Sequence, residues 1–403
     1  MSDVEHVLAH AVARHRQGHL AEAKTVYEAV ISRSMNPNIN GAALAHLAVL
    51  HLKQDRIAAG LLAAEQALSL NADNGTAFWA WLQCHRRLGE PGRSLHSLLQ
   101  RSTYGLPPNI LHEMGLCYEA EGDHRKAYLA FKEAKRRISF ANMDINRNLL
   151  LEYMRAVAAA TGKTTEAAFT SDLEGEHEPV FLVGFNESGV RELGEMLAKH
   201  PGLRLAVEVP AMTAARQCLN GKDPAGLAAV TDSELCDARR AYFDAINRVT
   251  PGPARVVDAL PMNVLMIGLI RRMFPSSPII HCIRHPCEAV LNTFVRPYTL
   301  NNVTCHFDRL ERTALTYAGV MAIADEMSKN PVLDVSTVRY DDLMTHPNEI
   351  VHAIASAVDP TADPTIRYAP RCPVPRWTNY RAEMSRWLPT LQPFAAAFGY
   401  PAK

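Results

Sequence analysis

The sequence predicts an α + α/β chain, in which an N-terminal array of paired helices precedes an α/β domain built on a parallel sheet. Residues 5–135 show helical patterning almost throughout and no strand-like alternation. From residue 179 onward, apolar runs of strand length such as "VFLVGF" and "SSPIIHCIR" alternate with helix-length stretches. This alternation is typical of a parallel sheet with helices on both faces. We therefore expect the array over 1–138, a helical linker over 139–178 and the α/β domain over 179–403.

The composition is that of a globular protein with a substantial core. The chain has 403 residues, of which 48% are hydrophobic and 21% are charged, and this length favours two or three domains. Lys+Arg 42 balances Asp+Glu 42, which argues against a general nucleic-acid or membrane-surface binder. No basic-then-apolar leader and no apolar run of bilayer length is seen, so we expect a cytoplasmic protein without membrane insertion.

Eight cysteines are scattered without CxxC pairs, which favours reduced thiols over disulfides. The run "HCIRHPC" gathers His281, Cys282, His285 and Cys287. Because two of these residues are adjacent and much of the run is expected to alternate in and out of a sheet, they do not converge as zinc ligands do. We therefore expect no metal site.

The N-terminal array is expected to be a repeat. Its second helices align on Ala23, Gly60, Ser94 and Ala127, close to the period of about 34 residues found in tetratricopeptide repeats. The clearest copy is "HEMGLCYEAEGDHRKAYLAFKEA", in which Gly115 permits close packing and Gly122 makes the turn. This part of the chain resembles the tetratricopeptide family.

That resemblance implies stacked helix pairs with a concave face, because one pair cannot bury its apolar side alone. One interpretation is a groove for a peptide or partner protein. The other is that the array only supports the next domain or mediates self-association into a homo-oligomer.

In the α/β domain we expect helices over 189–199, 231–248 and 262–273. Ligands of such sheets bind outside the carboxyl ends of the strands. Polar residues follow expected strands in Gly184–Arg191 and in Arg284–Asn292, and a third polar segment is "PRWTNY".

Four blocks of this domain resemble the sulfotransferase family, in the family's order. They are "PVFLVGFNESGVRELGEMLAKHPGL", "VVDALPMNVLMIGLIRRMFPSSPIIHCIRHPCEAVLNTF", "VRYDDLMTHP" and "VPRWTNYRAEMSRWLPTLQPF", and they span residues 179–396. The resemblance implies a P-loop-NTPase-like parallel sheet. A tetratricopeptide array fused to such a domain is a bacterial arrangement within that family.

The resemblance also implies an activity, the transfer of a sulfuryl group from 3′-phosphoadenosine 5′-phosphosulfate (PAPS) to a hydroxyl or amine. The product nucleotide would be adenosine 3′,5′-bisphosphate. A base takes the acceptor's proton, while cations and backbone N–H groups hold the donor. By position, the resemblance implies that Glu208 is the base. It implies that the 5′ end of the donor is bound by Gly184, Ser188, Gly189 and Arg191, and that the 3′ end is bound by Arg284, Asn292 and Arg376.

Two cations of the family pattern are missing. The loop arginine is replaced by Glu187, and the lysine thought to stabilise the leaving oxygen is replaced by Ala259. At about 4 Å and an effective dielectric near 20, a lost attraction and a gained repulsion are each worth roughly 4 kcal/mol before screening. Arg191 could compensate only from a different flank of the anion.

Each candidate also has a plainer interpretation. Arg284 and Arg376 could be structural ion-pair residues, and Glu208 could cap a helix instead of acting as a base. Tyr340, Asp341 and Asp342 are more easily explained as a structural turn than as chemistry, and Asp258, Pro261 and Asn263 as strand-end architecture.

Three hypotheses therefore remain open from the sequence. The chain is a working sulfotransferase with a substitute cation, an inactive relative that serves with its array as a scaffold, or a transferase for a different donor.

Overall fold

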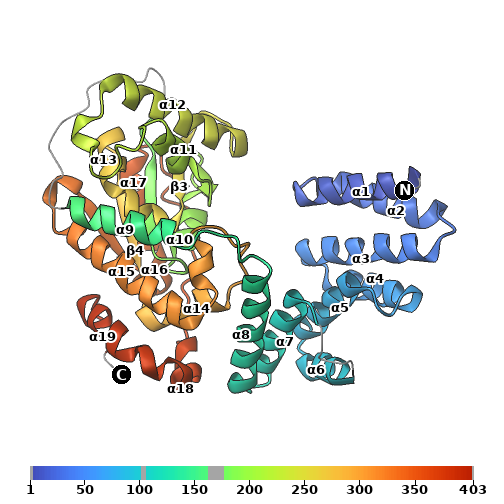
Figure 1. Cartoon of the computed structure of the whole chain (residues 1–403). Helices are drawn as coiled ribbons and strands as arrows, with labels where there is room; N and C mark the ends of the chain where they lie inside the picture. Colours follow the sequence, from blue (N-terminus) through green and yellow to red (C-terminus); the bar gives the residue numbers. More distant parts are fainter. Residues whose placement is uncertain (1–2, 101–105, 162–176, 402–403) are drawn as a thin grey trace. The chain divides into compact units, whose positions relative to one another are not determined.

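The computed structural model describes residues 3–100, 106–161 and 177–401. The chain divides into two compact units, Met1–Ala141 and Asn142–Lys403 (Figure 1). The linker predicted over 139–178 lies partly outside the described residues, and its described part contains helix α9, Asn148–Ala160. In the described part of the chain, no helix combines the length and the apolar character needed to cross a membrane.

The first unit consists of helices packed in sequence order. Asn36, Asn74 and Asp123 cap the helices that follow them, each accepting a hydrogen bond from a backbone N–H of the first turn. The helices are α1 (Asp3–Arg16), α2 (Leu20–Arg33), α3 (Pro37–Lys53), α4 (Ile57–Leu70), α5 (Gly75–Arg87), α6 (Pro91–Gln100), α7 (Pro108–Ala120) and α8 (His124–Phe140).

Each pair of helices in this unit is joined by a turn with one residue in the left-handed conformation. The residues are Gly18, Asp55, Gly89 and Gly122. Glycine adopts this conformation without a steric penalty, and Asp is one of the few other residues that tolerate it. The equivalent turns give the unit a repeated helix-pair construction.

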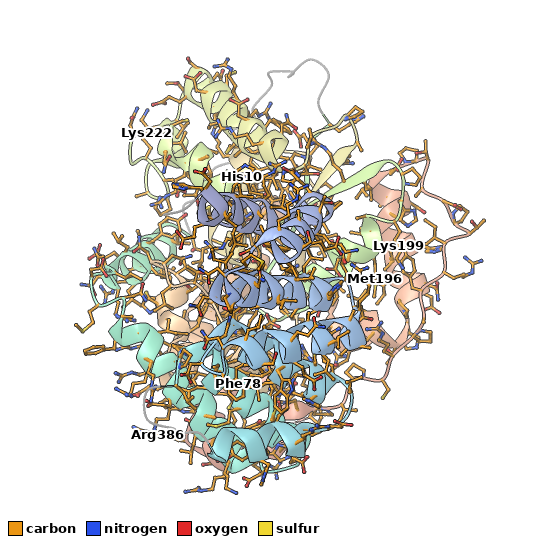
Figure 2. The ribbon with its side chains drawn as sticks, turned by 90° about the vertical axis from the view of Figure 1, so that its right-hand side faces the viewer. His10, Phe78, Met196, Lys199, Lys222 and Arg386 are labelled. Atoms are coloured by element: carbon orange, nitrogen blue, oxygen red, sulfur yellow. The ribbon has the colours of Figure 1, made fainter. Side chains whose placement is uncertain are left out.

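The pairs are held together by small residues at close contacts. Ala23, Gly60, Ser94 and Ala127, on which the sequence copies align, are all buried. Gly115 lies against the ring of Phe131, and a β-carbon at this position would be 2.4 Å from a ring carbon. Phe78 of α5 (Figure 2) is buried in a neighbouring apolar cluster.

The second unit contains the predicted parallel sheet, which is confirmed. Its five strands lie in the order β2-β3-β1-β4-β5, and all four pairings are parallel. The strands are β1 (Val180–Gly184), β2 (Leu203–Val207), β3 (Arg255–Ala259), β4 (Ile279–Ile283) and β5 (Val335–Arg339).

Helices follow the strands and cover the sheet (Figure 1). The stretch predicted as one helix over 262–273 begins as a 3-10 helix, Pro261–Met266, before α13 (Ile267–Met273). The remaining α-helices are α10 (Val190–Leu197), α11 (Ala211–Gln217), α12 (Asp232–Val249), α14 (Pro286–Val295), α15 (Leu310–Ser328), α16 (Tyr340–Thr345), α17 (Pro347–Val358), α18 (Arg381–Met384) and α19 (Leu388–Ala397).

The strand register brings three chain segments to one edge of the sheet. Gly184 at the end of β1 pairs with Cys282 of β4, and Leu182 pairs with Ala259 at the end of β3. Because the strands are parallel, the loops after β1, β2, β3 and β4 all leave from this edge. Apolar residues from β1, β3, α10 and α17 form a buried core that packs the helices against the sheet.

Replacing Gly115 by Ala tests the close packing of the repeat. The added methyl group would overlap Phe131, so we expect the free energy of unfolding to fall by about 1–3 kcal/mol, measured by urea denaturation followed by circular dichroism. Gly75→Ala is the matched control, because a β-carbon there meets no atom within 4 Å. Equal stability of the two variants would contradict this account.

Candidate functional site

The loop after β1 has the geometry of an anion-binding turn. A β-carbon on Gly184 would lie 2.4 Å from the carbonyl oxygen of Cys282, and one on Gly189 would lie 2.7 Å from the ring of Tyr340. Only glycine fits either place. Between them, the Ser188 Oγ is buried and has no hydrogen-bond partner. The loop therefore keeps its shape, its backbone N–H groups at the start of α10 and one uncommitted hydroxyl.

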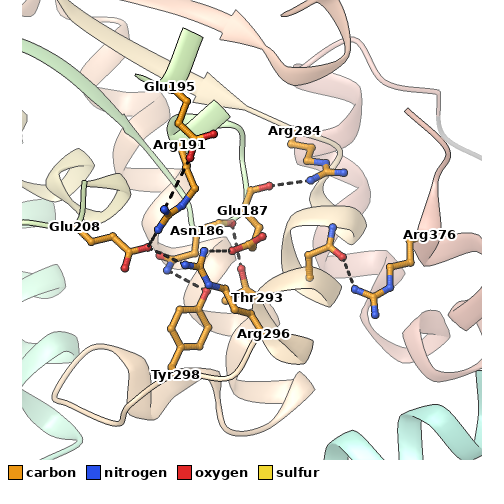
Figure 3. A network of polar contacts seen from close by, with 11 residues as sticks. Asn186, Glu187, Arg191, Glu195, Glu208, Arg284, Thr293, Arg296, Tyr298 and Arg376 are labelled. Carbon is orange, nitrogen blue, oxygen red and sulfur yellow. Dashed lines mark hydrogen bonds and ion pairs between the residues drawn. The ribbon is translucent and has the colours of Figure 1, made fainter. Parts of the chain in front are cut away.

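Two acidic residues and two arginines close the mouth of this loop (Figure 3). The Glu187 Oε1 accepts a hydrogen bond from Arg296 Nη1 at 2.5 Å. The Glu208 Oε1 accepts one from Arg296 Nη2 at 3.0 Å and another from Arg191 Nη2 at 3.1 Å. We call these four residues the acid–arginine cluster, and its formal charge is zero.

The cluster holds both acids in an uncommon backbone conformation. Glu187 has φ 62° and Glu208 has φ 54°, in the left-handed region that non-glycine residues rarely adopt. Each such residue costs on the order of 1 kcal/mol, which the surrounding structure must supply. Arg296 is the residue they share. Burial disfavours its charged form, but the hydrogen bond and charge of Glu187 outweigh burial, so the pKa of Arg296 is raised.

Glu208, the predicted base, follows the end of β2. One of its carboxylate oxygens is already held by two guanidinium groups. To accept a proton at that oxygen it would have to give up one of these charge-assisted hydrogen bonds. Glu208 is not a helix cap, because no capping hydrogen bond to α11 is seen in the described residues. Its local role is to bridge Arg191 and Arg296.

Arg191 does not face the carboxylate of Glu187. Besides Glu208, its guanidinium lies 4.0 Å from Glu195, one turn further along α10. A third acid, Glu192, lies in the first turn of the same helix. Burial raises the pKa of Glu192, as does the nearby charge of Glu187, while its own backbone N–H lowers it. The start of α10 thus carries carboxylates where an anionic donor would need cations.

Arg284, after β4, is largely buried. Its Nη1 donates to the backbone carbonyl oxygen of Glu187 at 3.2 Å, and its guanidinium carbon lies 3.9 Å from the centre of the Tyr340 ring. Its Nη2 is 3.6 Å from Oε1 of Glu288. Tyr340 begins helix α16, so the "YDDL" segment forms the first turn of a helix and not an isolated turn.

Glu288 gathers the three residues that were predicted to hold a 3′-phosphate. Asn292 Nδ2 donates to Glu288 Oε1 at 3.2 Å, and the backbone N–H groups of Arg376 and Trp377 donate to its two oxygens at 3.3 and 3.0 Å. Arg376 Nη1 donates to Asn292 Oδ1 at 2.9 Å. Arg284, Asn292 and Arg376 therefore lie around one buried carboxylate.

The position of the missing lysine lies in the core. Ala259 is 1% exposed, and a β-carbon built on Gly194 of α10 would lie 3.3 Å from its β-carbon. Next to it, the fully buried Asp258 accepts hydrogen bonds from Tyr242 at 3.0 Å and from Asn263 at 3.3 Å. These contacts give Asp258 and Asn263 a structural role at the strand end.

Among the described residues, no group of three or more His, Cys, Asp or Glu side chains lies close enough together to hold a metal ion. His281 lies within β4, and burial lowers its pKa to about 4. His285 stacks on the ring of Trp377, with centroids 5.0 Å apart.

Comparison with known proteins finds a family that resembles part of this unit. Residues 179–364 match the sequence model of the sulfotransferase family, so this region is similar to that family. An uncharacterized protein of Aquifex aeolicus (strain VF5) is 24% identical to this chain over 139 residues, which are 32% of this chain and 18% of that protein. The chain thus matches less than a fifth of that relative's length.

Among solved structures, the crystal structure of sulfotransferase STF9 from Mycobacterium avium is similar to this chain. The two are 11% identical, the match covers 72% of this chain and 92% of STF9, and the TM-score is 0.37.

The residues present fit the 3′-phosphate end of PAPS better than its sulfate-bearing end. Ser188 keeps an uncommitted hydroxyl next to the start of α10, and Arg284 and Arg376, which the resemblance assigns to the 3′-phosphate, both lie near Glu288. The acid–arginine cluster does not fit the sulfate-bearing end, because both of its cations are already paired with carboxylates. Arg296 was not among the residues predicted from the sequence.

The burial of Asp258 predicts a pH-dependent stability. Burial raises its pKa to about 7, against the hydrogen bond from Tyr242 that lowers it. The folded state then holds a proton that the unfolded chain releases near pH 4, so the free energy of unfolding falls as the pH rises from about 4 to about 7.

In the variant Asp258→Asn the side chain stays neutral, so its contribution to stability does not change with pH. Relative to the wild type, we expect it to gain roughly 4 kcal/mol of stability between pH 4 and pH 8 in urea denaturation. Asp237→Asn, at an exposed position in α12, is the control. If the free energy of unfolding changed with pH in the same way in the wild type and in Asp258→Asn, the titration of Asp258 would not contribute to stability.

Proposed function

We propose that the chain is a catalytically inactive relative of the sulfotransferases, which acts as a protein-binding scaffold through its helical array. In this proposal the array is a tetratricopeptide repeat that binds a peptide or partner protein. The α/β domain keeps a weak site for a 3′-phosphorylated nucleotide of the adenosine 3′,5′-bisphosphate class. The observation that carries the proposal is the acid–arginine cluster, in which both arginines at the loop mouth are paired with carboxylates of the chain itself.

Charge is the reason that the cluster opposes sulfuryl transfer. Negative charge develops on the bridging oxygen of the donor, and catalysis depends on cations or N–H groups aimed at it. Here Glu187 and Glu208 neutralise Arg296 and Arg191, and Glu192 adds a further carboxylate at the helix start. The lysine of the family pattern is replaced by the buried Ala259. The leaving oxygen is left without a dedicated cation.

The 3′ half supports residual nucleotide binding. Arg284 follows β4, Asn292 lies on α14 and Arg376 lies in the C-terminal segment, and two guanidinium groups suit a terminal phosphate. Glu288 competes for the same donors, because it accepts from Asn292 and lies near Arg284. We therefore propose a weak site at this end.

A second candidate function is favoured by the placement of Arg296. Its guanidinium reaches the loop mouth, on the side from which a substitute cation could act, and its side chain is one-third exposed. If Arg296 turns from Glu187 to the donor, the domain is a working sulfotransferase that transfers the sulfuryl group of PAPS to a hydroxyl of a protein or saccharide. Glu208, once released, would then serve as the base.

Titration of the full chain with adenosine 3′,5′-bisphosphate tests the proposed nucleotide site. We expect weak binding by calorimetry, weakened about tenfold to a hundredfold in Arg284→Gln or Arg376→Gln, because each removes a charge-assisted hydrogen bond to phosphate. The control is Arg381→Gln, whose guanidinium is exposed and lies over Trp377.

Radiolabelled PAPS, offered with a tyrosine peptide and with a saccharide, tests for transfer. We expect no labelled product above the rate without protein. Labelled product that is lost in Arg296→Gln would instead establish the second candidate function.

Removing one acid from the loop mouth should restore donor affinity. Glu187→Gln deletes a repulsion and removes one of the two carboxylates that hold Arg296, so we expect adenosine 3′,5′-bisphosphate to bind about tenfold more tightly at low salt, with a smaller gain at high salt. Glu195→Gln, on an exposed turn of α10, should leave affinity unchanged. An unchanged affinity in Glu187→Gln would mean that its charge does not limit binding.

A further inference from the structure

Arg376 stands at the end of a long irregular stretch of chain. Residues 359–375, all of them described by the structure, form no helix or strand. The last part of this stretch is open to solvent, since Val374 is 81% exposed and Pro375 is exposed as well. The stretch ends at a 3-10 helix, Arg376–Tyr380. The position of Arg376 therefore depends on what holds the first turn of this short helix.

The carboxylate of Glu288 holds that turn from a different element. Glu288 lies in the first turn of α14 and is 4% exposed. Its Oε1 accepts a hydrogen bond from the backbone N–H of Arg376 at 3.3 Å, and its Oε2 accepts one from that of Trp377 at 3.0 Å. The first N–H groups of a helix have no partner inside it, and the side chain of Pro375 contains no acceptor. Glu288 thus caps the short helix and ties it to α14.

The neighbouring residue Trp377 strengthens the same attachment. It is buried, and its ring stacks on His285 with centroids 5.0 Å apart. His285 immediately precedes α14, and its Nδ1 accepts a hydrogen bond from the backbone N–H of Cys287 at 3.2 Å. The start of the 3-10 helix is therefore attached to the first turn of α14 through two backbone hydrogen bonds and one ring contact.

This attachment decides where the guanidinium of Arg376 can reach. Its Nη1 donates to Oδ1 of Asn292 at 2.9 Å (Figure 3). Asn292 lies one turn beyond Glu288 on α14 and donates to Glu288 Oε1 at 3.2 Å. Nη2 of Arg284 is 3.6 Å from the same oxygen. One carboxylate thus contacts all three residues that the resemblance assigns to the 3′-phosphate.

We propose that Glu288 is a positioning residue of the nucleotide site, which holds Arg376 in place for the 3′-phosphate. This inference rests on the proposed nucleotide site and names the residue that assembles it. Glu288 also competes with a phosphate for Asn292 and Arg284, so its two effects have opposite signs. Positioning outweighs competition, because without Glu288 the segment that carries Arg376 would have to be ordered each time a nucleotide binds.

A double-mutant cycle on the full chain tests whether Glu288 acts through Arg376. Glutamine matches glutamate in size but keeps one acceptor oxygen, and its amide N–H₂ cannot accept a backbone N–H. In calorimetry with adenosine 3′,5′-bisphosphate, we expect Glu288→Gln to weaken binding at least about tenfold. Arg376→Gln should cost about tenfold in the wild type, but less than about twofold when Glu288→Gln is already present.

Limited trypsin digestion tests the attachment without a nucleotide. Once the short helix is released from α14, we expect cleavage after Arg376, identified by mass spectrometry, to become about tenfold faster in Glu288→Gln. Glu311→Gln is the matched control, because Glu311 lies in the first turn of α15 and is exposed. It should leave both binding and cleavage unchanged, and circular dichroism should show that all variants are folded.

Three results would overturn the positioning role. They are equal or tighter binding in Glu288→Gln, which would make Glu288 a competitor alone, additive effects of the two substitutions, and unchanged cleavage after Arg376. Any of these, with binding to the wild type intact, leaves the proposed nucleotide site standing. Absence of nucleotide binding in the wild type and in every variant would remove that site, and the positioning role with it.

Discussion

The candidate site depends on one guanidinium group, that of Arg296, shared between the carboxylates of Glu187 and Glu208. Without it, two acids in left-handed conformations would remain at the mouth of the loop, and the carboxylate of Glu187 would lose its ion pair, because Arg191 pairs with Glu208 and Glu195. With it, the segment after α14 is tied to the ends of β1 and β2. One contact therefore fixes the loop and also cancels the charge that a sulfate donor would need.

The sequence was sufficient for the helical first unit, the parallel sheet and the glycines of the loop, because apolar runs and glycines report directly on strands and turns. It also showed that Glu187 stands where the family has a cation. It could not supply the partner of Glu187. Arg296 lies 109 residues further along the chain, and only the pairing of β1 with β4 brings the end of α14 to the loop. The sequence contained one indication of this pair: an acidic residue, Glu187, follows β1 and requires a cation from a neighbouring element.

The surroundings of Glu288 show the same limit of sequence reasoning. Arg284, Asn292 and Arg376 were each found from the resemblance, but Glu288, the carboxylate around which they lie, was not. Local patterns predict elements, while charge balance belongs to the assembled fold.

The close approach of Gly194 to Ala259 limits which side chains residue 259 can carry. A lysine at residue 259 would need room for four methylenes where α10 and β3 are in contact. Because residue 259 is buried, its side chain would also have to extend out of the core to bring the ammonium group to solvent or to a ligand. A lysine at residue 259 would therefore require α10 to move away from β3. Packing at this contact, in addition to charge at the loop mouth, opposes a cation at the place where the resemblance expects one.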